Sequence, residues 1–415
     1  MYLSTTRAAA RAPGDRVRRR PVGGVPVSGT VIGLGLVSMF TDMSAEMVTA
    51  ILPMYLIYGV GVGYLELGAI DGLYTGATAV LRLAGGYAAD RLGRPKAVAA
   101  VGYGLSAVTK LGFPLVGGSV PGIGAVLACD RAGKGIRTAP RDAMITLATP
   151  RAGLGRAFGL HRALDTAGAL LGPLIAFALI AGVAVGYDAV FTVSFGLAVI
   201  GLIVLLFFVT APPATPTKGA QVGLRAGLAL FRGRGLRRIG LAAGLLGVCT
   251  VGDMFLYLAL QQRTDLPPAV LPLLPLGTAL VFMAAAVPVG RLADRLGRWR
   301  VFLTGHVVLV AVYLLVATAP SLPVAALVLV CHGLFYAATD GVLMALAAPH
   351  IPEHLRGTGL AVVQTVQALA RATGAVLFGV LAAGIALGPA FAVATAALAC
   401  TLMIAARIGR REEQP

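Results

Sequence analysis

Charged side chains are scarce in this sequence. Asp, Glu, Lys and Arg make up 12% of its 415 residues, whereas hydrophobic residues make up 58%. Soluble globular domains carry about 25% charged and about 45–50% apolar residues. No soluble fold of this length could bury so much apolar surface, so a lipid bilayer must surround part of the chain. The scarcity of charge therefore excludes an ordinary soluble enzyme or binding domain.

Sequence signatures of catalysis and of resident metals are also missing. No Walker A loop occurs, which excludes ATP as an energy source within this chain. No Ser–His–Asp arrangement at a soluble turn and no zinc-ligand spacing occur, so we expect neither an enzyme nor a cofactor nor a bound metal. The single tryptophan, Trp299, argues against a sugar-stacking site. The cysteines fall within apolar segments and are typical of small core residues, namely Cys129, Cys249, Cys331 and Cys400.

The chain nevertheless has a formal net charge of +17. A basic chain can bind nucleic acid, but these lysines and arginines cluster between apolar segments rather than along one soluble face. We therefore expect the lipid bilayer, and no nucleic acid, as the partner of this charge.

Apolar runs long enough to cross a bilayer recur along the chain. A helix needs about 20 such residues to span the hydrocarbon core. The first six predicted spans are 28–60, 66–89, 97–117, 120–146, 156–182 and 186–210. The second six are 239–262, 268–292, 300–318, 322–348, 357–384 and 387–408. The predicted fold class is therefore an all-α membrane protein with two six-helix bundles.

The other segments complete a division into five parts. A basic tail, 1–27, precedes the first bundle, 28–210. A Pro-rich and then basic linker, 211–238, leads to the second bundle, 239–408. A second short tail, 409–415, follows.

Lysine and arginine follow an alternating pattern along this division. They concentrate in both tails, in the linker and in every second loop, whereas the other loops carry almost none, with Arg263 beside Asp265 as the exception. Basic loops stay on the cytoplasmic side of a membrane. The pattern therefore predicts an even number of helices, both termini in the cytoplasm, and a multi-pass protein of the cytoplasmic membrane.

A nine-residue motif occurs once in each half. The segment 86–94 reads Gly-Tyr-Ala-Ala-Asp-Arg-Leu-Gly-Arg, and 290–298 reads Gly-Arg-Leu-Ala-Asp-Arg-Leu-Gly-Arg, an offset of 204 residues. A second echo follows in the same order, because Ala-x-Pro at 148–150 recurs at 347–349. Two elements that repeat in order indicate duplication, which is common among transporter folds.

The duplicated motif resembles the signature cytoplasmic loop of the major facilitator superfamily. Arg131-Ala-Gly-Lys134-Gly135 likewise resembles the family's Arg-x-x-x-Gly element. The resemblance covers 28–408 and implies a monomeric transporter of twelve helices. Its two pseudo-symmetric bundles would flank a central cavity and rock against each other around a small-molecule substrate.

The resemblance also implies a gating role for both copies of the motif. The first glycine of each copy would allow close helix approach, and the second a tight turn. Asp90 would meet the start of the eleventh helix near Gly357, and Asp294 the start of the fifth near Gly155, each carboxylate facing a helix N-terminus. Such contacts would close the cytoplasmic side. The assigned residues are Gly86, Asp90, Arg91, Gly93, Arg94, Gly290, Asp294, Arg295, Gly297 and Arg298.

The fifth predicted helix carries Gly168-x-x-x-Gly172-Pro173. Glycines four residues apart make a flat face for close packing, and a proline bends a helix. The motif resembles an element common in proton-coupled exporters of the same superfamily, although the glycine pair that follows it there is missing here. Ordinary helix packing explains it as well, so it favours export without settling the direction.

Two carboxylates lie inside the first predicted helix. Asp42 and Glu46 are spaced i,i+4 and share one face. Acids at bilayer depth mark transport pathways, and a close pair suits a proton relay. Arg131 is the candidate for charge coupling to them. The alternative is that both acids are structural counter-ions to Arg82, Lys110 or Arg131.

Three further residues are candidates for coupling. His161 and Asp165 are spaced i,i+4, and histidine titrates near neutral pH; the alternative is a salt-bridge network with the basic residues of the fourth helix. Asp253 is placed to line the cavity opposite the first helix. Two ion pairs are also predicted: Asp130 with Lys134, and Asp340 with Arg371.

These features together predict a secondary active transporter. The first hypothesis is export of a small molecule in exchange for protons by alternating access. The second is transport of a metal ion or metal chelate, with the same acids as ligands. A third is a sensor on a permease fold that moves no substrate.

Overall fold

The computed structural model describes residues 28–92, 94–150, 153–182, 186–210, 229–318, 321–352 and 356–410. Within these ranges every regular element is a helix and no strand occurs. Local sequence sets the helix boundaries. Before α4, for example, the Ser119 hydroxyl accepts a hydrogen bond from the backbone N–H of Gly122. The all-helical prediction is confirmed for the described residues.

The first half contains six long helices with two short π-helical continuations. They are α1 (Gly29–Met54), η1 (Tyr55–Val60), α2 (Tyr64–Leu92), α3 (Pro95–Val116), α4 (Val120–Leu147), α5 (Leu154–Phe177), η3 (Ala178–Gly182) and α6 (Tyr187–Phe208).

The second half repeats this plan with a broken first span. Its elements are η4 (Leu230–Arg232), α8 (Arg234–Val248), α9 (Asp253–Arg263), η5 (Pro268–Leu273), α10 (Leu274–Leu296), α11 (Arg298–Thr318), α12 (Leu322–Ala347), η6 (Ala348–His350), α13 (Arg356–Ile385) and α14 (Leu387–Arg410).

Ten segments of the described chain are long and apolar enough to cross a membrane. The helices α2 and α4, with 29 and 28 residues, are equally long but more polar. They pack among the other helices, since α2 contacts α4 and α13, and α4 contacts α3. Each of the twelve predicted spans coincides with one of these segments. The largest difference is at the seventh, predicted from 239 and observed from Arg234, inside the predicted linker.

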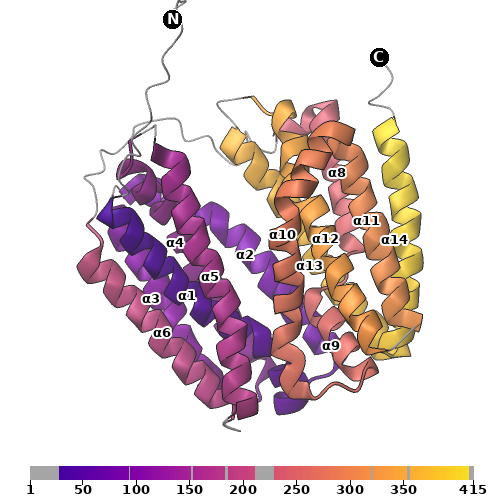
Figure 1. Cartoon of the computed structure of the whole chain (residues 1–415), viewed down its shortest axis with the longest axis horizontal. Helices are drawn as coiled ribbons and strands as arrows, with labels where there is room; N and C mark the ends of the chain where they lie inside the picture. The colour runs from indigo at the N-terminus through magenta and orange to yellow at the C-terminus, as the bar shows by residue number, and fades with distance from the viewer. Residues whose placement is uncertain are drawn as a thin grey trace, which may run out of the picture.

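The two sets of helices form two bundles side by side (Figure 1). The start of α1 and the end of α14 lie on one face of the molecule, which we call the terminal face; the other end is the opposite face. Helix α13 packs on α2, and η5 packs on α1 and α5, so the bundles meet along these elements.

Glycines allow the closest helix contacts. A Cβ atom at Gly168 would lie 2.2 Å from the carbonyl oxygen of Met39, and one at Gly172 would lie 2.7 Å from that of Met43. The backbones of α5 and α1 therefore touch, in agreement with the packing face predicted from Gly168, Gly172 and Pro173. Between the bundles, Gly68 similarly meets the backbone of α13, at 2.6 Å from the carbonyl oxygen of Ala375.

The duplicated loops are described in part. Gly93 and the side chains of 79–93 lie outside the described residues, so the roles predicted for Gly86, Asp90, Arg91 and Gly93 stay predictions. In the second copy, Gly297 has φ +98°, which glycine adopts without strain. A Cβ atom at Gly290 would have open space around it, so the predicted close approach is absent there.

The Asp294 carboxylate does not reach α5. It accepts hydrogen bonds from the Arg298 guanidinium four residues later, at 2.9 and 3.1 Å. The same guanidinium donates to the backbone carbonyl of Ala345 on α12 at 2.8 Å. The contact predicted between Asp294 and the start of α5 is therefore not formed in this arrangement, because the second copy of the motif binds within its own bundle.

All four cysteines are free. Cys129 and Cys400 are exposed on helix surfaces, so the prediction of core positions is wrong for these two. A thiol behaves as a small apolar group, which suits a lipid-facing position as well as a core.

Candidate functional site

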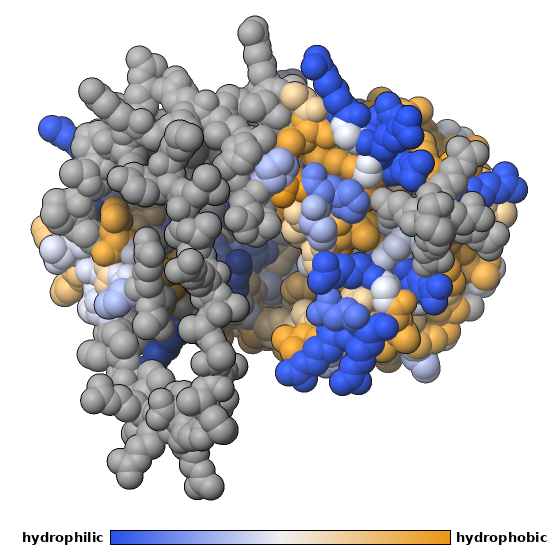
Figure 2. Space-filling view, turned by 90° about the horizontal axis from the view of Figure 1, so that it is seen from above, coloured by the Kyte–Doolittle hydropathy of each residue, from blue (hydrophilic) through white to orange (hydrophobic). Residues whose placement is uncertain are grey.

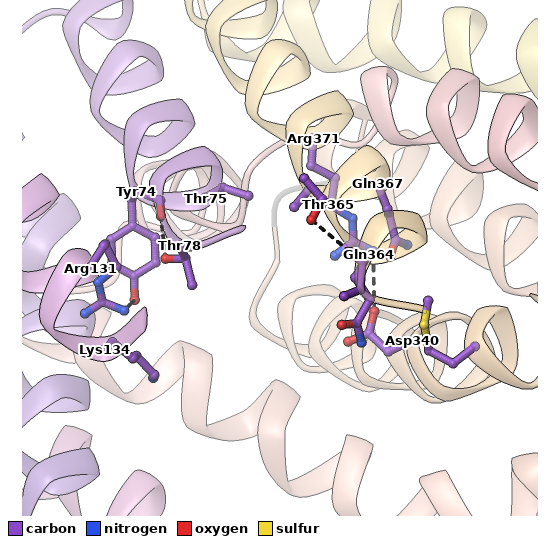
Figure 3. Close-up of a pocket in the computed structure, with 13 residues that line it drawn as sticks. Tyr74, Thr75, Thr78, Arg131, Lys134, Asp340, Gln364, Thr365, Gln367 and Arg371 are labelled. Carbon is purple, nitrogen blue, oxygen red and sulfur yellow. Dashed lines mark hydrogen bonds and ion pairs between the residues drawn. The ribbon is translucent and has the colours of Figure 1, made fainter. Parts of the chain in front are cut away.

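A cavity of about 420 Å³ lies between the two bundles. Figure 3 shows Tyr74, Arg131 and Lys134 on one side, facing Gln364 and Arg371 on the other. The lining is polar and draws on both halves. Its residues are Tyr74, Thr75, Thr78, Arg131, Lys134, Asp340, Met344, Ala361, Gln364, Thr365, Gln367, Ala368 and Arg371.

Arg131 is held at the cavity wall by a buried ion cluster. Asp130 accepts from the Lys110 ammonium at 2.6 Å and from the Arg131 guanidinium, and all three side chains are buried. The guanidinium also stacks on Tyr74, 4.3 Å from the ring centroid. The predicted pairing of Asp130 with Lys134 is therefore wrong, because Lys110 of α3 lies closer.

Asp42 finds its basic partners on α4, but these do not include Arg131. Its Oδ1 lies 3.5 Å from Arg137 and 4.0 Å from Lys134. Its carboxyl group also faces that of Asp165 on α5. The structure thus replaces the predicted Asp42–Arg131 coupling with a four-residue cluster of Asp42, Lys134, Arg137 and Asp165.

His161 and Asp165 do not form the predicted pair. The His161 Nε2 lies 2.8 Å from the Ser38 hydroxyl on α1. Asp165 instead lies 3.2 Å from Arg162 and 3.8 Å from Arg141. Residues spaced i,i+4 share a face, but here His161 binds Ser38 of α1, and Asp165 pairs with Arg162 of its own helix and with Arg141 of α4.

A second cavity, of about 310 Å³, also lies between the bundles. Three carboxylates from three helices line it: Glu46 of α1, Asp253 of α9 and Asp340 of α12. Among the described residues, no lysine, arginine or histidine lines it. The other lining residues are Thr49, Pro53, Ala169, Pro173, Met254, Tyr257, Pro275, Leu276, Thr278, Ala279, Phe282 and Tyr336.

The acids of this cavity differ in how well they are paired. Glu46 makes no hydrogen bond or ion pair with any described residue. Asp253 accepts from the Tyr336 hydroxyl at 2.8 Å, with the His332 Nε2 at 3.5 Å. Asp340 lies 3.6 Å from Arg371, which is the ion pair predicted between helices ten and eleven.

Several residues of the site were not found from the sequence. Tyr74 stacks on Arg131, and Tyr336 donates a hydrogen bond to Asp253. Tyrosines inside apolar runs occur at many positions that bind nothing, so no local pattern singles these out. The position of Lys134 at the cavity wall follows only from the packing of α4 against α2.

The bundles are joined at the opposite face. There the Tyr58 hydroxyl donates to the Gln261 side-chain oxygen at 2.6 Å, and the Tyr64 hydroxyl to that of Gln262 at 3.3 Å. Asp71 of α2 is buried against Gly252, at the break between α8 and α9. Seen onto the terminal face, hydrophilic residues gather over the part of the surface that Figure 2 leaves uncovered, and the surface beside them is hollowed.

The sequence model described as Major Facilitator Superfamily matches residues 34–375. The chain belongs to this superfamily. Two helical bundles with a polar cavity between them are the architecture that the resemblance predicted, and both the family and the fold class are thereby confirmed.

Proteins similar to this superfamily member in sequence or structure support the same family and fold. It is 32% identical over 364 residues to the uncharacterized MFS-type transporter MJ1317 of Methanocaldococcus jannaschii, an alignment that covers 86% of this chain and 89% of the relative. It is also similar to the crystal structure of the nucleoside transporter NupG, with a TM-score of 0.79 at 13% identity, covering 92% and 99% of the two chains.

A POT family transporter crystallised with 5-aminolevulinic acid has a TM-score of 0.74 at 14% identity, covering 91% of this chain and 96% of the other. At such identities the two structures support the fold alone. This superfamily member is a multi-pass membrane transporter, and its family is one of transporters rather than of enzymes.

Proposed function

We propose that this protein exports a small molecule in exchange for protons by alternating access. The observation that carries the proposal is the Glu46 carboxyl group, which lines a cavity between the bundles and has no ion-pair partner in the described chain. An acid at bilayer depth that no cation neutralises is suited to bind and release a proton.

Exchange follows if proton and substrate compete for this carboxyl group. When Glu46 binds a substrate group, its proton must leave, and when a proton binds, the substrate must leave. Asp42 and Asp165, which face each other beside Lys134 and Arg137, form a second place where a proton can be held or passed on. Arg131 is better suited to positioning, since Asp130 and Tyr74 hold it.

Alternating access requires one face to open while the other closes. Here the halves are hydrogen-bonded at the opposite face, whereas Asp294 stays on its own bundle at the terminal face. We propose that the terminal face is cytoplasmic, in the cytoplasmic membrane of the cell, because the start of α1 and the end of α14 lie there and basic tails adjoin both in the sequence. We further propose that the chain acts as a monomer.

Export is the direction that the α5 motif favours. Gly168 and Gly172 bring α5 onto α1 beside Glu46, and Pro173 lines the same cavity as Glu46. The metal hypothesis lacks comparable support, since no group of three or more His, Cys, Asp or Glu side chains able to hold an ion occurs in the described part of the chain.

The test is transport in inverted membrane vesicles with an imposed pH gradient, across a panel of labelled small molecules. We expect gradient-driven uptake of a substrate by the natural protein and its loss in Glu46→Gln, with equal amounts of protein in the membrane. Asp188→Asn, an exposed acid at the start of α6, is the matched control and should transport normally. Full activity in Glu46→Gln would refute the proton role, and no flux of any substrate would favour a sensor.

A further inference from the structure

The two cavities between the bundles carry opposite charges. Three of the residues lining the first are cationic, namely Arg131, Lys134 and Arg371, and one is acidic. The second is lined by Glu46, Asp253 and Asp340 and by no basic residue of the described chain. Asp340 lines both, so the cavities are neighbours around one side chain of α12.

The first cavity has cationic donors that the protein does not use. The Lys134 ammonium donates no hydrogen bond to a described residue, and its nearest carboxylate oxygen, on Asp42, lies 4.0 Å away. Across the cavity, the Arg371 guanidinium lies 3.6 Å from Asp340, and its buried Nε has no hydrogen-bond partner. A buried donor without a partner is costly unless a ligand or water satisfies it. One cation from each bundle is therefore available to an anionic group.

The second cavity offers the complementary chemistry. Among the described residues, Glu46 has no hydrogen-bond or ion-pair partner, and Asp253 is bound only by the Tyr336 hydroxyl and by His332. Met254, Phe282 and three prolines supply apolar walls around these acids. Carboxylates set among apolar and aromatic groups suit an organic ammonium group with hydrocarbon beside it.

The geometry points to a zwitterionic substrate, whose anionic group binds Lys134 and Arg371 in the first cavity while its ammonium group binds Glu46 and Asp253 in the second. This inference rests on the proposed function, because the ammonium group would be the one that displaces the proton from Glu46. Both groups would contact the two bundles, so a bound zwitterion would link them. A free amino acid with an apolar side chain, or a dipeptide, has the required charges, and cavities of about 420 and 310 Å³ have room for molecules of this size.

Equilibrium binding to the purified full-length protein, at one pH and without a gradient, tests this. The probes are free apolar amino acids and dipeptides, each with its methyl ester, which lacks the anion, and its N-acetyl form, which lacks the cation. We expect at least one zwitterion to raise the thermal unfolding midpoint. Its blocked forms should bind about 10- to 100-fold more weakly, because a charge-assisted hydrogen bond contributes roughly this factor.

Variants assign each charge to its cavity. Lys134→Gln and Arg371→Gln should weaken binding of the zwitterion but not of its ester, whereas Glu46→Gln should weaken the zwitterion but not the N-acetyl form. Arg371→Lys keeps the charge and should retain more binding than Arg371→Gln, which separates loss of recognition from misfolding. Arg291→Gln removes an exposed arginine of α10 outside both cavities and is the control.

Equal binding of a zwitterion and its blocked forms would overturn the inference, and so would the absence of binding by every zwitterion in the panel. The outcome is separable from the proposed function. If a singly charged substrate is transported by the pH gradient in a Glu46-dependent way, the proposed function holds and the zwitterionic substrate is refuted. If a zwitterion binds but no gradient-driven flux occurs, the zwitterionic ligand holds and proton-driven export is refuted.

Discussion

The ion cluster of α4 holds one carboxylate between two cations inside the membrane. Asp130 binds Lys110 at 2.6 Å and also Arg131, and it accepts from the Ser106 hydroxyl at 2.6 Å. Both cations therefore contact the carboxylate directly, and the cluster keeps a net charge of +1. Such a cluster has no free site for a proton or substrate, which separates it from Glu46 and makes it structural.

Removing the carboxylate should destabilise the protein. Asp130→Asn leaves the Lys110 and Arg131 charges buried without their counter-ion, and breaking a buried ion pair costs about 3–5 kcal/mol. We expect a clearly lower thermal unfolding midpoint in detergent. Asp188→Asn, at an exposed position, should leave the midpoint unchanged. An unaltered midpoint in Asp130→Asn would mean that the cluster does not stabilise the fold.

The sequence predicted which helices carry buried charge but not which charges meet. Spacing of i,i+4 suggested Asp130 with Lys134 and His161 with Asp165, and the structure has neither pair. Partners on a neighbouring helix, such as Lys110 for Asp130 and Ser38 for His161, are decided by packing. Helix rotation and depth are not encoded in local spacing, so pairs between helices could not be derived from it.

At the scale of the helices, the site depends on the close packing of α5 against α1. The Gly168 Cα approaches the backbone of Met39 so closely that no side chain fits. The same contact fixes where Glu46 and Pro173 stand in their shared cavity. Packing of these two helices and the chemistry of the site are therefore linked.

Adding one methyl group should test that link. In Gly168→Ala, the new Cβ would lie 2.2 Å from the Met39 carbonyl oxygen, so α5 must move away from α1. Overpacking of this kind costs about 1–3 kcal/mol, and we expect a lower unfolding midpoint together with reduced transport. Gly159→Ala lies on the same helix with open space around it and should lower neither. Equal effects of the two substitutions would argue against a special role for the α1–α5 contact.

Each of the twelve predicted spans coincides with a helical segment, and ten of these segments are apolar enough to cross a bilayer. The break in the seventh span could not be found from apolar length. Residues 239–262 form one apolar run, yet α8 ends at Val248 and α9 starts at Asp253. The break is supported by distant residues: the backbone N–H of Val251 donates to the Tyr313 hydroxyl at 2.7 Å, and Asp71 of the other bundle packs on Gly252.

For the whole molecule, the interface at the opposite face determines which way the cavities open. It combines the Tyr58–Gln261 hydrogen bond with the burial of Asp71, whose Oδ2 has no hydrogen-bond partner. Burying an unpartnered carboxyl group is unfavourable. This contact therefore opposes the closed interface, while the packing of α2 on α13 favours it, and a balance of this kind suits an interface that must open in every transport cycle.

Locking this interface should stop transport reversibly. In a protein whose four native cysteines are replaced by alanine, Tyr58→Cys with Gln261→Cys places one thiol on each bundle, at positions whose longer native side chains are joined by a hydrogen bond of 2.6 Å. Cysteine side chains are too short to bridge this contact directly. We therefore expect a bis-maleimide with an internal disulfide to cross-link the pair and abolish flux, and a reductant to restore it, because alternating access requires these residues to separate. Each single cysteine variant should transport under both conditions.

A second pair on the terminal face makes the test directional. Asp294 and Gly155 would meet only if that face closed, and in the present arrangement Asp294 instead binds Arg298. Cysteines at these two positions should therefore cross-link slowly, and faster under conditions that favour opening of the opposite face. If both pairs cross-link equally fast in one state, or if cross-linked Tyr58→Cys/Gln261→Cys protein still transports, rocking of the two bundles about a central site is not the mechanism.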